Sequence, residues 1–219
     1  MAAAFAAWGG ERPDYTLLGA GVRSKPDYLG SSDRKVELVP VVRYYRGPWF
    51  VRTTHGAFEG GARAALGSGW EAGAQPAYEE GPREDDPGAS VGAHLKWDGN
   101  VGPAPVSLLA RLRQHLDTDR GMQIDTRATV GVFAGGGLGL AVFAQATWAN
   151  ARSTLAHYGL RESGLLYASA GLQGGYELSR QWLIVGNLEW RGLSDDVALS
   201  PIVQRRSGAY ASAGLAYRF

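Results

Sequence analysis

Apolar side chains alternate with polar or small ones along the C-terminal segment, residues 208–219. One face carries Ala211, Ala213, Leu215, Tyr217 and Phe219, and the intervening residues form the other face. A period of two predicts a β-strand. An apolar strand that ends on an aromatic residue is typical of the closing strand of an outer-membrane barrel, with aromatic side chains at the lipid interface.

Similar segments recur every 10 to 20 residues and are separated by turn residues. The predicted strands span 13–23, 35–46, 48–55, 57–66, 69–78, 89–97, 104–116, 121–134, 137–149, 165–178, 181–192 and 209–219. About twelve strands is an even number, as in bacterial single-chain barrels. No helical period competes with them and no boundary divides the chain. We therefore expect an all-β fold, a transmembrane antiparallel up-and-down β-barrel over residues 13–219, preceded by an N-terminal segment, residues 1–12.

The two faces of a strand are clearest in the segment 181–192. The outward set is Trp182, Ile184, Gly186, Leu188 and Trp190, and the inward set is Leu183, Val185, Asn187, Glu189 and Arg191. Tryptophan at both ends of the apolar face matches two aromatic girdles on either side of an apolar band about 25 Å tall.

Periodicity alone does not say which face points into the barrel, and a soluble barrel would have its apolar face inside. Charged residues gather on one face of several strands, whereas tryptophan and tyrosine cap the other, and this favours a polar lumen in a membrane barrel. The candidate lumen-lining residues are Arg43, Arg111, Arg113, Asp125, Arg127, Glu189 and Arg191. These residues would line either a narrow polar path or a salt-bridged plug, and the sequence leaves both open.

The connections between the predicted strands alternate in length. Those at 47–48, 67–69, 98–103, 135–137 and 179–180 are short, whereas those at 24–34, 79–88, 150–164 and 193–208 are longer; two further connections are short exceptions. If both termini are periplasmic, the short set forms periplasmic turns and the long set forms extracellular loops, which is the asymmetry of outer-membrane barrels.

Composition narrows the function classes. The chain of 219 residues has no cysteine, which excludes disulfides, zinc–thiolate sites and cysteine catalysis. Its net charge of +1 argues against a nucleic-acid partner. No apolar run reaches about 18 residues, so no transmembrane helix is expected. The segment from Met1 to Ala7 lacks the basic and apolar regions of a signal peptide, and we expect a mature sequence without its natural signal.

No catalytic, cofactor or metal site is predicted. The sequence contains neither H-E-x-x-H nor G-x-S-x-G. His157 is interpreted as a solvated loop residue and His115 as part of an ion pair at the barrel rim. The acidic segment 79–87 is interpreted as a solvated loop, and the glycines of 135–139 as a hairpin turn, because no helix follows them to bind phosphate.

Several motifs make the chain resemble the MipA/OmpV family of outer-membrane proteins. Gly19-Ala-Gly21 is followed by Pro26-Asp-Tyr28-Leu-Gly30-Ser31, which is similar to a family signature near the N-terminus. The block 38–50, the segment 146–150, the late 200–203 and the C-terminal 217–219 are similar in type and in order. The family usually has an aspartate before the late Ser-Pro, whereas Leu199 stands there in this chain. The candidate loop residues are Pro26, Tyr28, Gly30, Ser31, Ser200 and Pro201, and the first loop is expected to fold over the mouth of the barrel.

The resemblance implies a twelve-stranded barrel in the bacterial outer membrane, in contact with outer-membrane lipid and lipopolysaccharide. It also implies a non-enzymatic role as a scaffold for peptidoglycan-remodelling proteins, namely a lytic murein transglycosylase (a murein hydrolase) and a peptidoglycan synthase. Short periplasmic turns offer little area compared with a standard interface of about 1,600 Å². The alternative is a narrow pore or a ligand- or antibiotic-responsive receptor that uses the lumen and the extracellular loops. An outer-membrane hydrolase is the third class considered.

Overall fold

The computed structural model describes residues 14–54, 57–79 and 88–219, and these residues form a closed antiparallel barrel of twelve strands. The predicted N-terminal segment 1–12 and most of the acidic segment 79–87 lie outside the described residues. The strands, in chain order, are β1 (Tyr15–Pro26), β2 (Arg34–Arg46), β3 (Trp49–Thr54), β4 (Ala57–Gly67), β5 (Trp70–Glu79), β6 (Gly88–Val101), β7 (Ala104–His115), β8 (Met122–Gly135), β9 (Leu138–Ala149), β10 (Gly164–Glu177), β11 (Trp182–Leu193) and β12 (Ser207–Arg218).

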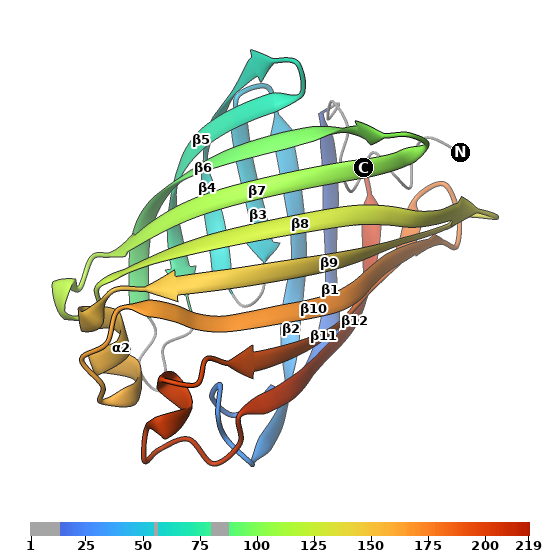
Figure 1. The fold of residues 1–219 in the computed structure, drawn as a ribbon. Helices are drawn as coiled ribbons and strands as arrows, with labels where there is room; N and C mark the ends of the chain where they lie inside the picture. The colour runs from blue at the N-terminus through green and yellow to red at the C-terminus, as the bar shows by residue number, and fades with distance from the viewer. Residues whose placement is uncertain (1–13, 55–56, 80–87) are drawn as a thin grey trace.

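Each strand pairs with its neighbours in sequence, and β1 closes the barrel against β12 (Figure 1). The closing register runs from Leu17 opposite Arg218 to Ser24 opposite Ala211. Tight turns connect many of the successive strands of this β-meander. In the turn between β8 and β9, Gly136 and Gly137 have φ values of 57° and 80°. A two-residue turn of this kind requires positive φ at both central residues, which favours glycine. The predicted twelve-stranded up-and-down barrel is confirmed.

The outward and inward faces also agree with the sequence. Trp182 and Trp190 are 43% and 58% exposed, whereas Leu183 and Glu189, on the other face of β11, are 3% and 2% exposed. Because the apolar face points outward and charged residues point inward, the barrel has the sense of a membrane protein rather than a soluble one.

Three details differ from the sequence-based predictions. Strand β6 continues to Val101, so the expected connection 98–103 is a turn of Gly102 and Pro103. Strand β1 continues to Pro26, which pairs with Arg34, so this proline belongs to the barrel wall. Three or four extra residues of alternating sequence do not distinguish a long hairpin from a long loop.

The third difference is a helix within the connection 150–164. Helix α2 (Ala151–Tyr158) follows Asn150, whose side chain accepts a hydrogen bond from the Ser153 N–H at 3.0 Å. It ends at Gly159, which has a φ of 71°. Two turns are too short for a clear helical period, but an asparagine cap and a closing glycine were the available signals. No helix in the described part of the chain is long and apolar enough to cross a membrane.

The two ends of the barrel have different structures. Figure 1 shows α2 at the end opposite the C-terminus, and the 3-10 helix η2 (Val197–Leu199) belongs to another connection of that end. We call this the loop end. The end at which β1 begins and β12 finishes is called the turn end.

Candidate functional site: a charged lumen with apolar residues at the turn end

A buried ion-pair network follows the inner wall of the barrel across β7 and β8. Asp125 is 2% exposed and accepts hydrogen bonds from Arg111 Nε and Arg113 Nε, both at 3.0 Å. Thr147 donates to the same carboxylate at 2.8 Å. Arg111 lies opposite Asp125 in the register, so strand pairing itself brings these charges together. The structure thus joins three of the predicted lumen residues in one cluster.

The network reaches further round the wall through two glutamates that sequence analysis did not select. Glu59 on β4 is 1% exposed and accepts from Arg52 Nε at 2.5 Å and from Arg111 Nη1 at 3.2 Å. Arg113 also forms an ion pair with Glu79 at the end of β5. Glu59 occupies an inward position of its predicted strand, and this was the signal that could have found it. Glu79 was predicted to lie in a solvated loop, which was wrong, because β5 extends to it and it is 8% exposed.

Further charged residues continue round the wall from β8 to β12. Arg191 donates to Glu189 at 2.8 Å, and its guanidinium lies 4.0 Å from the centre of the Tyr210 ring. Arg127 lies 3.6 Å from the centre of the Phe143 ring and donates to a glutamine on β10 at 2.8 Å. Cation–π contacts of this kind hold guanidinium groups on the wall.

Apolar and aromatic side chains fill the lumen near the turn end. Tyr45 stacks on Tyr15 at 5.1 Å and on Phe50 at 6.2 Å between ring centres. Leu17 and Leu183 are 2% and 3% exposed and pack together beside them. These residues, which we call the floor, come from β1, β2, β3 and β11, which with β12 follow one another round one side of the barrel. The sequence placed Leu183 on the inner face but did not predict that it packs against Leu17 there.

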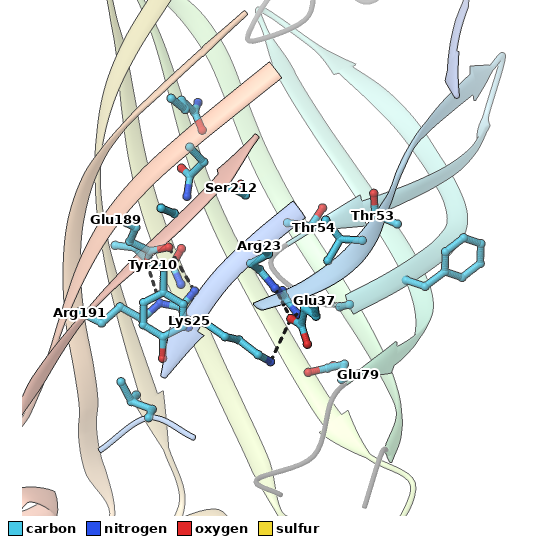
Figure 2. Close-up of a pocket in the computed structure, with 18 of the residues that line it drawn as sticks. Arg23, Lys25, Glu37, Thr53, Thr54, Glu79, Glu189, Arg191, Tyr210 and Ser212 are labelled. Carbon is cyan, nitrogen blue, oxygen red and sulfur yellow. Dashed lines mark hydrogen bonds and ion pairs between the residues drawn. The ribbon is translucent and has the colours of Figure 1, made fainter. Parts of the chain in front are cut away.

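A cavity of about 530 Å³ lies above the floor. It extends from Leu17 and Leu183 to Tyr28 and Tyr158 at the loop end. Figure 2 shows cationic and acidic side chains around it, with Arg23 and Lys25 directed at Glu37 and Arg191 at Glu189. The described lining contains six cationic side chains, Arg23, Lys25, Arg43, Arg111, Arg113 and Arg191, and four carboxylates, Asp27, Glu37, Glu79 and Glu189.

Three loop-end connections bind one another beside the cavity mouth, and we call residues 27–33, 150–163 and 194–206 the loop cap. Tyr28 donates to the Ile202 carbonyl at 2.8 Å, and the Gly30 carbonyl accepts from the backbone N–H of Gln204 at 2.8 Å. Ser200 donates to the Tyr158 carbonyl at 2.6 Å. Gly30 has a φ of 112°, which favours glycine at this position.

The remaining loop candidates lie at the edge of this arrangement. Ser31 accepts a hydrogen bond from the Asp33 N–H at 3.0 Å, which shapes the first loop. Pro26 is buried at the end of β1, and Pro201 is exposed. Tyr28, Gly30 and Ser200 are therefore the candidates that join the loops.

Replacing Ser200 with alanine is expected to loosen the loop cap. The buried Tyr158 carbonyl would lose its donor, and an unmet buried acceptor costs about 1–3 kcal/mol. Hydrogen–deuterium exchange in α2 should therefore accelerate. Ser163→Ala, at an exposed position of the same connection, should leave the exchange rates unchanged.

The loop cap is also expected to weaken in acid. Burial lowers the pKa of His157, whose Nδ1 lies 2.7 Å from the Ser153 carbonyl, and nearby His115, Arg113 and Arg120 disfavour its protonation. Above the ordinary value of 6.5 the imidazole is neutral in both the closed and the open cap. Below it the open cap binds the proton more readily than the closed cap. The stability of the closed cap therefore decreases as the pH is lowered.

The measurement is hydrogen exchange in α2 across that pH range. The protection factor, which corrects the measured rate for the slower intrinsic exchange in acid, should fall below pH 6.5 in the natural protein, and His157→Gln should remove most of the change. An identical pH profile in the two proteins would contradict the assignment to His157.

Two histidine interpretations were wrong. His115 is 6% exposed, and neither ring nitrogen has a hydrogen-bond partner among the described residues, while neighbouring Asp117 pairs with Arg120 at 3.5 Å. His157 is half-buried, with its ring 6.3 Å from that of His115 between centres, rather than fully solvated. Among the described residues, no three metal-ligating side chains come together.

Comparisons with known proteins place this geometry in a family. A family model described as MltA-interacting protein MipA matches residues 18–219. A search of curated protein sequences gave no significant match.

Solved outer-membrane barrels share the fold at low sequence identity. The structure of the NanC porin is 11% identical, with a TM-score of 0.54, and covers 92% of this chain and 98% of its own. An outer-membrane channel from Pseudomonas putida F1 is 11% identical, with a TM-score of 0.54, and covers 97% of this chain and 98% of its own. An anion-selective porin from Comamonas acidovorans is 9% identical, with a TM-score of 0.51, and covers 94% and 99%. The barrel is therefore an outer-membrane barrel. In such barrels the short turns are periplasmic and the longer loops extracellular, so we expect the turn end to face the periplasm.

Proposed function

Since the chain belongs to the family of MltA-interacting proteins and lies in the bacterial outer membrane, we propose that it is a non-enzymatic receptor that binds a small anionic solute in its lumen. The observation that carries this proposal is the cavity of about 530 Å³, which meets the loop cap at one end and is lined by the floor residues Leu17 and Leu183 toward the other. A volume of this size suits a small-molecule ligand. We infer that the floor closes the lumen below the cavity, and a closed floor favours binding over steady conduction.

The lining favours an anion. Six cationic side chains and four carboxylates line the described cavity, and tyrosines 28, 158, 167 and 210 supply hydroxyl groups and ring faces. Arginine and lysine bind carboxylate and phosphate oxygens through charge-assisted hydrogen bonds. A sugar acid combines such an anionic group with hydroxyls that tyrosine can bind.

Thermal unfolding with glucuronate and with glucose tests this proposal, because the two sugars share a ring and differ in charge. A ligand at a hundred times its Kd stabilises a folded protein by about 2.7 kcal/mol. Glucuronate is therefore expected to raise the Tm and glucose to leave it unchanged. Equal effects of the two sugars, or none from either, would overturn the proposal.

A matched pair of variants locates the effect. Lys25 lines the cavity and is 8% exposed, whereas the side chain of Arg206 is 66% exposed at the rim. Lys25→Gln is expected to raise about tenfold the glucuronate concentration that gives the same increase in Tm. This is the effect of losing one charge-assisted hydrogen bond. Arg206→Gln should keep the response of the natural protein.

A second candidate function is the scaffold for a lytic murein transglycosylase and a peptidoglycan synthase, which the family description favours. Its contact surface would be the periplasmic turns, of which 47–48, 68–69, 102–103 and 136–137 have two residues each. Such turns offer little of the roughly 1,600 Å² that a standard interface buries. The connection 178–181 adds a slightly longer turn.

Photo-cross-linking from the turn between β8 and β9 in intact cells tests the scaffold candidate. A photoreactive residue at Gly136 should capture a murein hydrolase or synthase, whereas one at exposed Pro201, on the extracellular side, should not. Recovery of uncross-linked barrel alone, with good incorporation, would count against the scaffold.

A further inference from the structure

Within the described residues, β3 pairs with only part of β2, and the loop-end half of β2 has no partner on that side. The register between these strands runs only from Arg43 opposite Arg52 to Arg46 opposite Trp49. Strand β2 continues to Arg34 and pairs with β1 along that whole length. On its other side, residues 34–41 have no paired strand within the described parts of the chain.

Thr53 marks the point at which strand pairing ends. Its hydroxyl accepts from the Val42 N–H at 3.0 Å and donates to the Pro40 carbonyl at 3.0 Å. The backbone groups of these even-numbered residues therefore face β3. Pro40 has no N–H to offer at this edge, and proline is a common device at open sheet edges. Beyond Pro40, the backbone groups of Val36 and Leu38 face the same gap, because alternate residues of a strand point their backbone groups to the same side.

This open edge lies at the depth of the lipid. Val36 and Leu38 are 73% and 83% exposed on the outer face of β2, and Phe58, at the start of β4, is 49% exposed. An unpaired strand edge is not stable in the hydrocarbon region unless it lines a polar cavity. The cavity does reach this edge, since Leu38, Pro40 and Thr53 are among its lining residues.

Cationic side chains lie directly behind the gap. Figure 2 shows Arg23 and Lys25 on the lumen side, with Thr53 and Thr54 nearby on β3. Arg23 Nε lies 2.6 Å from Glu37, Lys25 Nζ lies 3.5 Å from the same carboxylate, and Lys35 Nζ lies 3.9 Å away. Apolar residues outside and cations inside form an amphipathic opening.

We propose that this gap is a lateral portal for an amphiphile of the outer leaflet whose phosphate headgroup has a net negative charge. The phosphate binds in the cavity beside Arg23 and Lys25, where charge-assisted hydrogen bonds favour it. The acyl chains remain in the lipid against Val36, Leu38 and Phe58. The portal and the proposed receptor share the same cavity, and the portal depends on the proposed function in this respect alone.

Photo-cross-linking in vesicles tests the portal. A benzophenone amino acid at Val39 would face the cavity at the gap, one at Leu188 would face lipid on another strand, and one at Gln173 would face the cavity from β10. The vesicles contain phosphatidylcholine alone, phosphatidylcholine with phosphatidylglycerol, or phosphatidylcholine with lipid A. Leu188 is expected to capture lipid in every vesicle and Gln173 in none.

Val39 is expected to capture phosphatidylglycerol or lipid A at least about tenfold more than phosphatidylcholine, the ratio that one charge-assisted bond supplies. Lys25→Gln should reduce that capture about tenfold, and Arg206→Gln should not. The vesicle that gives the adduct identifies which phosphate-bearing lipid enters.

Four results would overturn the portal. The first is the absence of a lipid adduct at Val39 while Leu188 is labelled, and the second is capture of phosphatidylcholine at Val39 equal to that of the anionic lipids. The third is loss of the Val39 adduct when inorganic phosphate is added, and the fourth is an adduct between Val39 and a protein chain. Competition by inorganic phosphate would indicate a soluble anion, and a protein adduct would indicate strand pairing at the edge. If glucuronate still stabilises the barrel, the proposed receptor stands without the portal, and loss of both responses overturns both proposals.

Discussion

Replacing Asp125 with asparagine is expected to lower the free energy of unfolding by about 3–5 kcal/mol, the typical cost of removing one partner of a buried ion pair. Asp125 is 2% exposed and holds Arg111 and Arg113, both within 3.0 Å. Asparagine keeps the size of the side chain but leaves two buried guanidinium groups short of one negative charge. Unfolding by urea in lipid vesicles, followed by tryptophan fluorescence, measures the change.

The matched control is Asp195→Asn. Asp195 pairs with Arg206 at 3.2 Å, but its side chain is 97% exposed, and exposed pairs contribute little. No measurable change is expected there. Equal stability of Asp125→Asn and the natural protein would show that the lumen network is well hydrated rather than buried.

Replacing both Leu17 and Leu183 with alanine is expected to open the floor. The two side chains are 2% and 3% exposed and close the periplasmic end of the cavity. Each truncation removes buried apolar volume and destabilises by about 2–5 kcal/mol. The space that remains joins a charged cavity to the periplasm, so discrete ion conductance is expected in planar lipid bilayers.

Leu166→Ala is the control for the loss of stability alone. Leu166 is 5% exposed and belongs to the apolar cluster with Tyr158 and Val197 at the loop end. This single substitution should destabilise the protein about as much as either floor substitution does, and it should not produce conductance. Conductance in both variants would show that general loosening, rather than the floor, controls the path.

Much of the wall was predictable because a membrane strand repeats one simple rule. The alternation in 181–192 assigned Trp182 and Trp190 to lipid and Glu189 to the lumen, as the structure shows. The same rule brought Arg111 and Asp125 to neighbouring inward positions, and pairing in register placed them together.

The floor, the loop cap and the open edge were not predictable in the same way. Leu17 and Leu183 are inward apolar residues, and only the pairing of β1 and β11 with β12 shows that they pack together. The bond from Tyr28 to Ile202 joins positions that no local pattern relates. Pro40 was the one local signal of an open edge, but its meaning depends on where β3 ends.

Bilayer recording on the natural sequence tests the central claim, a receptor cavity closed at its periplasmic end, most directly. The closed floor predicts no sustained conductance steps from the inserted protein in concentrated KCl, with steps appearing once Leu17 and Leu183 are both alanine. Sustained steps from the natural protein, blocked by glucuronate, would contradict the closed floor and make the barrel an open anion-binding pore.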